Sequence, residues 1–87
     1  MLRIRERESA AHTMHVEGRL VGPWVKELRR SCEAAAAAGR QVAIDLADVD
    51  FADLDGLALL LELRDEGFDL VNCSAFLREQ LRAAGAR

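Results

Sequence analysis

The segment Gln41–Glu62 reads QVAIDLADVDFADLDGLALLLE and carries most of the information about the fold. Val42, Ile44 and Leu46 alternate with small or polar residues, which is the pattern of a half-buried β-strand. An acidic stretch follows, and an apolar helix is predicted to open at Gly56. The segment therefore predicts a strand that leads through an acidic turn into a helix, as in α/β folds.

Five carboxylates are concentrated in this turn, at Asp45, Asp48, Asp50, Asp53 and Asp55. Open α/β folds place their binding sites outside the carboxyl ends of the strands. A helix N-terminus also offers unpaired N–H groups and a partial positive charge. We therefore expect a functional site in the turn, with Asp53 as the N-cap of the helix.

The first forty residues predict two strands and a helix. Residues 2–5 and 14–20 alternate between apolar and polar side chains, and a polar turn between them allows antiparallel pairing. Gly22 and Pro23 predict the start of a helix, because the fixed φ of proline suits the first helical position. Gly39 is expected to end it.

The remaining residues predict a short strand between two helices. Gly67 is a plausible C-terminal cap for the second helix, Phe68 and Leu70 begin a strand, and Ser74 can cap a final helix. The predicted order is β-β-α-β-α-β-α within one domain, residues 1–87. We expect an α/β fold with a mixed four-stranded sheet and helices mainly on one face.

The central segment resembles the core of STAS domains, the sulphate transporter and anti-sigma factor antagonist family. The family loop typically reads D-L-S-x-V-x-F-x-D-S-S-G-L, and the matching residues are Asp45, Leu46, Val49, Phe51, Asp53, Gly56 and Leu57. Residues 16–20 look like the family's second-strand ending, and residues 67–71 look like the strand before its last helix. The resemblance covers most of the chain and implies a similar fold.

The chain departs from the family pattern at the two serines, which are Leu54 and Asp55 here. The residue before the glycine is the family's usual phosphoacceptor, so Asp55 occupies the phosphoacceptor-equivalent position. Residues 41–72 contain no Ser, Thr or Tyr. The resemblance therefore implies a site that cannot be phosphorylated at the usual position. Whether Asp55 imitates a phosphate or contacts a partner stays open.

The resemblance implies a cytoplasmic bacterial regulator of transcription signalling. Such a module would bind an anti-sigma factor or a serine kinase-like partner through the 48–57 loop and the following helix. The expected partner-binding residues are Asp48, Asp50, Asp53, Leu54, Asp55, Gly56 and Leu57. The alternative is a structural or scaffolding subunit that self-associates, for example as a homodimer, or assembles with other STAS domains.

Composition argues against nucleic acid and membrane as partners. The net charge is -3 and the pI is about 5.3, whereas phosphate neutralisation needs a surplus of Lys and Arg. No apolar run approaches the ~20 residues of a membrane span, and the N-terminus lacks the apolar core of a signal peptide. Cys32 and Cys73 match no C-x-x-C spacing, so two reduced thiols are expected.

Metal, cofactor and catalytic sites are not expected. A calcium-binding EF-hand loop ending at Glu62 would need a ligand at its first position, where Phe51 stands. His12 and His15 are three apart, which on a regular strand places them on opposite faces. Asp53 and Asp55 are a possible acid–base pair. The chain offers them no partner base or phosphate-binding glycine loop, so we expect no enzyme and no cofactor.

Overall fold

The computed structural model describes residues 2–7, 12–39 and 41–85, with the side chains of residues 5–7 excepted. Its elements are β1 (Leu2–Arg7), β2 (His12–Leu20), α1 (Pro23–Ala37), β3 (Val42–Ala52), α2 (Leu54–Asp65), β4 (Asp69–Val71) and α3 (Ala75–Gly85). This order confirms the predicted β-β-α-β-α-β-α arrangement.

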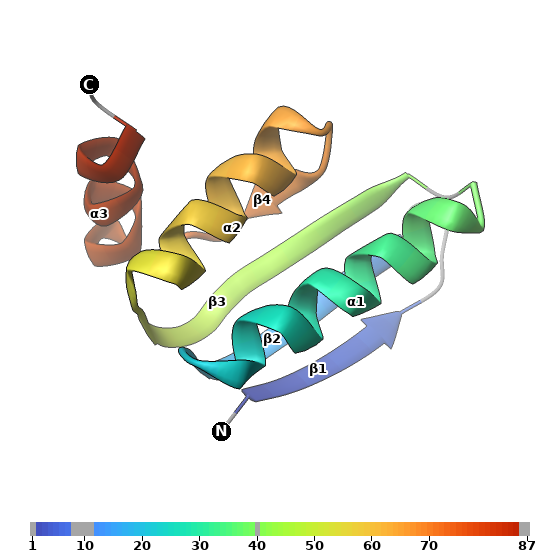
Figure 1. Ribbon diagram of the computed structural model, residues 1–87, viewed down its shortest axis with the longest axis horizontal. Coiled ribbons are helices and arrows are strands. Elements are labelled where there is room, and N and C mark those ends of the chain that lie inside the picture. Colours follow the sequence, from blue (N-terminus) through green and yellow to red (C-terminus); the bar gives the residue numbers. More distant parts are fainter. Residues whose placement is uncertain (1, 8–11, 40, 86–87) are drawn as a thin grey trace.

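The four strands form one mixed sheet in the order β1-β2-β3-β4. β1 pairs antiparallel with β2, whereas β2 with β3 and β3 with β4 are parallel pairs. Figure 1 shows α1 and α2 lying side by side over one face of the sheet, with α3 beside α2. The predicted α/β fold, with helices mainly on one face, is confirmed.

The core lies between the sheet and the helices. In the first part of β2 and β3, before the bulges, every second residue turns toward the helices, and Met14, Val16, Ile44 and Leu46 are fully buried there. The helices meet them with residues at helical spacing, namely Leu28, Cys32 and Ala35 on α1, Leu57, Leu60 and Leu63 on α2, and Leu77 and Leu81 on α3. The two-residue period of the strands and the 3.6-residue period of the helices therefore place these residues in one apolar layer.

The predicted helix boundaries are confirmed at three places. Pro23 is the first residue of α1 and follows Gly22, whose φ of 55° lies in the left-handed region that glycine tolerates. Gly67 follows α2 with φ 102°, and the next residue closes the helix end through a backbone bond. The Ser74 hydroxyl accepts the N–H of Leu77 at 3.0 Å and caps α3.

The prediction of an acidic turn after Leu46 is wrong. β3 continues to Ala52, and α2 begins at Leu54 instead of Gly56. The strand continues because its register against β2 shifts between His15 and Glu17 and again after Gly18. Each shift adds one residue on β3, as a β-bulge does, and so interrupts the alternation that marks a strand in sequence.

Candidate functional site

The carboxyl ends of β2 and β3 meet at the N-termini of α1 and α2, and Asp53 joins these elements. Its carboxylate Oδ1 accepts the backbone N–H of Gly56 at 2.8 Å, which caps α2. Its Oδ2 accepts the backbone N–H of Gly22 at 3.1 Å, at the start of α1. One side chain therefore connects two helix N-termini that lie next to each other.

Asp53 is held as a carboxylate. The N–H groups of Gly56 and Gly22 donate to its oxygens and hold its pKa below the usual range of an aspartate. The Asp53 backbone N–H also donates to the Leu20 carbonyl oxygen at 3.2 Å. The sequence predicted the N-cap. The second bond, to Gly22, appears only in the folded chain.

Gly56 allows α2 to approach the end of β2 closely. A Cβ atom at this position would lie 2.5 Å from the Leu20 carbonyl oxygen and 3.1 Å from the Leu20 Cγ. Leu57, the next residue, is only 5% exposed and belongs to the core. Gly56 and Leu57 therefore lie buried under the first turn of α2, and neither is exposed to solvent.

The exposed part of this junction is the first turn of α2. The Leu54 side chain is 80% exposed at the first helical position, and Asp55 follows it in solvent. We call this pair of residues the α2 N-terminal surface. Asp50, near the end of β3, is exposed as well. This large apolar side chain, exposed beside carboxylates at a helix start, is available for contact with another molecule.

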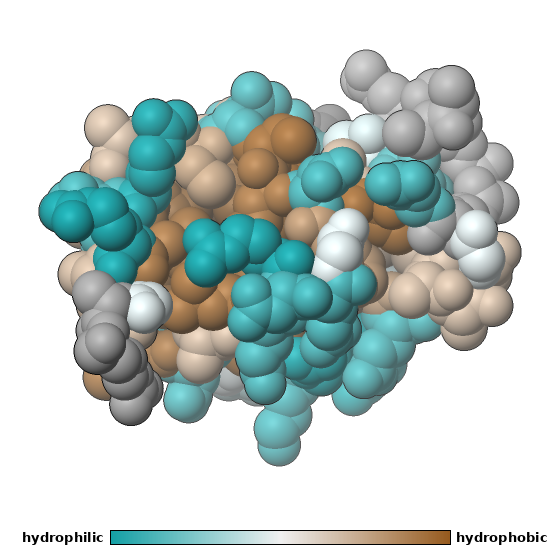
Figure 2. Space-filling model, turned by 90° about the horizontal axis from the view of Figure 1, so that it is seen from above, coloured by the Kyte–Doolittle hydropathy of each residue, from teal (hydrophilic) through white to brown (hydrophobic). Residues whose placement is uncertain are grey.

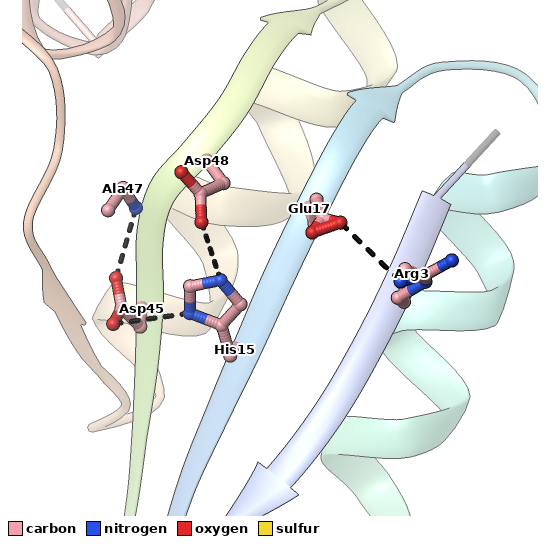
Figure 3. A network of polar contacts seen from close by, with 6 residues as sticks. All are labelled: Arg3, His15, Glu17, Asp45, Ala47 and Asp48. Carbon is pink, nitrogen blue, oxygen red and sulfur yellow. Dashed lines mark hydrogen bonds and ion pairs between the residues drawn. The ribbon is translucent and has the colours of Figure 1, made fainter.

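A second group of polar side chains lies on the sheet face without helices. His15 of β2 lies between two aspartates of β3 (Figure 3), with its Nε2 2.7 Å from the Asp48 Oδ2 and its Nδ1 3.4 Å from the Asp45 Oδ2. Asp45 also accepts the backbone N–H of Ala47 at 3.0 Å. This bond, more than the contacts with Asn72 and His15, holds the Asp45 pKa below its usual range against the opposing effect of burial.

The first bulge of β3 places the two aspartates on the same face. Residues three apart on a regular strand turn to opposite faces, yet Asp45 pairs with His15 and Asp48 pairs with Glu17. The predicted partner-binding set is therefore divided. Asp48 contacts His15 on the open sheet face, whereas Asp53, Leu54 and Asp55 lie at the start of α2.

His15, Glu17 and Asp48 also form the one group in the described part of the chain that could hold a metal ion. One nitrogen and two carboxylate oxygens lie within 4.8 Å of one another. In this structure His15 bonds to Asp48, and Glu17 pairs with Arg3 at 3.9 Å (Figure 3). An ion would have to replace the first contact and compete with the second. Its ligands come from two strands, with His15 and Asp48 33 residues apart in sequence, and the bulge in β3 sets their common face, so no local sequence pattern predicts the group.

The chain belongs to the STAS family, because the family described as "Mlab, STAS domain" matches residues 4–87. No curated protein sequence matches the chain. The solved structures that share its fold include two at low sequence identity. In the structure of the anti-sigma factor antagonist SpoIIAA in its unphosphorylated form, the match is 18% identical with a TM-score of 0.71, and it covers 94% of this chain and 82% of that one.

The second structure is an uncharacterized DUF3478-family protein with a SpoIIAA-like fold from Shewanella loihica PV-4. It is 17% identical, with a TM-score of 0.58, over 95% of this chain and 75% of that one. Both likenesses support the fold. Among the described residues, no helix is long and apolar enough to cross a membrane.

Proposed function

We propose that the chain, as a single STAS domain, is a regulatory protein-interaction module similar to an anti-sigma factor antagonist. Its partner is an anti-sigma factor or a serine kinase-like protein in a cytoplasmic signalling pathway that controls transcription, and the module itself is not an enzyme. The family membership and the SpoIIAA-like fold support this proposal. The observation that carries it is Leu54, 80% exposed at the start of α2.

The proposed interface is centred on the α2 N-terminal surface. Leu54 supplies apolar contact, because complete burial of a leucine side chain contributes about 1.5–3 kcal/mol. Asp55 and the exposed Asp50 supply charge that selects a partner with basic residues, whereas Asp48 is engaged with His15 on the open sheet face. Asp53, Gly56 and Leu57 support the surface, because they hold the first turn of α2 against β2 and α1.

The proposed module does not switch by phosphorylation at the usual position. Asp55 places a permanent carboxylate there, with one negative charge instead of the roughly -1.5 to -2 of a phosphoserine. Such a charge imitates the phosphorylated state only in part. We propose that Asp55 weakens binding to a partner that prefers an unmodified serine, without abolishing it.

A capture experiment with two matched variants tests the interface. Leu54→Asp removes the exposed leucine of α2, and Phe76→Asp removes a 60% exposed phenylalanine of α3. Immobilised wild type is expected to capture an anti-sigma or kinase-type protein from bacterial cytosol. Leu54→Asp should lose this protein, whereas Phe76→Asp should retain it. Equal capture by all three proteins, with unchanged circular dichroism, would place the interface elsewhere.

The exposed Phe76 supports a second candidate, a scaffolding subunit that self-associates or assembles with other STAS domains. Phe76 is a large apolar side chain, 60% exposed on α3, and offers an apolar contact on a helix other than α2. This candidate predicts that wild type forms dimers in light-scattering chromatography and that Phe76→Asp is monomeric. A monomeric wild type at high concentration argues against it.

A further inference from the structure

An open cavity of about 660 Å³ lies between α2, β4 and α3. Its apolar part comes from Leu70 and Leu81, together with the Cys73 thiol and Gly85, and three arginines complete the lining: Arg64, Arg78 and Arg82. Figure 2 shows apolar surface lying open among polar side chains at the side of the molecule where α3 lies. The size is that of a pocket for a small ligand.

The charge of the cavity is unusual for this chain. The three charged residues among its described lining are all arginines, although the chain as a whole carries a net charge of -3. Arg78 and Arg82 are four residues apart on α3, a spacing at which like charges repel each other. Arg82 is compensated by an ion pair with Glu79. Neither Arg64 nor Arg78 forms an ion pair with any residue that the structure describes.

The thiol in the cavity adds no opposing charge. Burial raises the pKa of Cys73, and the nearby Arg78 offsets this only in part. The side chain is therefore a neutral thiol near pH 7. The cavity therefore has two guanidinium groups without an ion-pair partner among the described residues, a third that is paired with Glu79, and an apolar floor. Its described lining contains no negatively charged group that would repel an anion.

We propose that this cavity binds a small phosphate monoester with a compact apolar substituent. Guanidinium groups recognise phosphate through paired N–H donors, and a dianion with three terminal oxygens can engage several arginines at once. A carboxylate has one charge and two oxygens, which a single arginine satisfies. Leu70 and Leu81 give the apolar substituent a surface to cover.

The cavity is separate from the α2 N-terminal surface. Arg64 lies about 15 Å further along α2 than Leu54, at about 1.5 Å per residue. Ligand binding in the cavity is therefore independent of the proposed protein partner. A ligand in the cavity and a protein partner at the other end of α2 can be bound at the same time.

The alkylation rate of Cys73 by iodoacetamide tests the proposal at the site itself. Cys73 is half-buried in the cavity wall, whereas Cys32 is buried in the core and provides an internal reference. Phenyl phosphate is the probe. Inorganic phosphate, which lacks the ring, and benzoate, which has a carboxylate in place of the phosphate, are the comparison ligands. We expect phenyl phosphate to slow alkylation of Cys73 saturably, and each of the other two anions to protect it less.

Arginine variants complete the test. Arg64→Gln and Arg78→Gln are each expected to raise the half-protecting concentration of phenyl phosphate by about 10-fold or more, because each loses a charge-assisted hydrogen bond. Arg30→Gln, at an exposed arginine of α1 paired with Glu27, is the matched control and should leave it unchanged. No saturable protection, or equal protection in Arg78→Gln and wild type, would overturn the site. Equal protection by inorganic phosphate and phenyl phosphate would overturn the proposed ligand class.

Discussion

Gly56→Ala tests whether α2 must lie as close to β2 as the structure shows. The added Cβ would lie 2.5 Å from the Leu20 carbonyl oxygen, whereas ordinary contacts begin at 3.4 Å. This oxygen already accepts the Asp53 N–H at 3.2 Å, so it cannot move without disturbing the cap of α2. Overpacking of this kind costs about 1–3 kcal/mol, and the better helix propensity of alanine returns up to about 1 kcal/mol.

The two effects leave a net loss for Gly56→Ala of about 1.5 kcal/mol, the middle of a range of about 0–3 kcal/mol, which lowers the Tm of a domain this small by about 6–12 °C. Thermal and urea unfolding followed by circular dichroism measure it. Gly85→Ala on α3 is the matched control, because its Cβ would lie 3.6 Å from the Leu61 Cδ2, in ordinary contact. Its Tm should be unchanged or slightly higher. A Tm of Gly56→Ala equal to or higher than that of wild type would refute the close approach of α2 to the end of β2.

Three further predictions concern the aspartates and the missing hydroxyl. Asp55→Asn and Asp55→Ser should both raise the affinity for an anti-sigma-type partner, measured by calorimetry. A lower affinity of both variants would instead show that Asp55 contacts the partner directly. The lowered pKa of Asp53 stabilises the fold above the unfolded pKa of about 3.9, and this stability is lost as the pH falls through the folded pKa. Asp53→Asn should therefore flatten the dependence of Tm on pH below about 4. If the Tm of the variant falls with pH as steeply as that of wild type, the Asp53 carboxylate does not cap α2 as the structure shows. Kinase-competent extract should leave residues 41–72 unphosphorylated in mass spectra, because they contain no hydroxyl side chain.

Most of the helices and strands could be predicted because their signals are local. Pro23 and Ser74 are read correctly as helix starts, since each acts on N–H groups within a few residues of itself. Met14, Val16 and Ile44 are read correctly as core, since a half-buried strand repeats every two residues. These features need no knowledge of what lies across the sheet.

The continuation of β3 to Ala52 could not be read in the same way. Two bulges interrupt its alternation, and bulges form only where a neighbouring strand supplies hydrogen bonds on either side of the extra residue. Without β2, the segment after Leu46 has the composition of a turn. The error moved the predicted start of α2 to Gly56, two residues later than it is.

The sequence by itself determined the order of elements, the cap at Asp53 and the absence of a phosphoacceptor at position 55, because each depends on residues close together in the chain. Only the tertiary structure decided which distant groups meet. Asp53 reaches Gly22 across 31 residues, and Asp48 reaches His15 across 33. The arginine cavity likewise joins α2 to α3. Such contacts depend on strand register and helix packing, which no local pattern specifies.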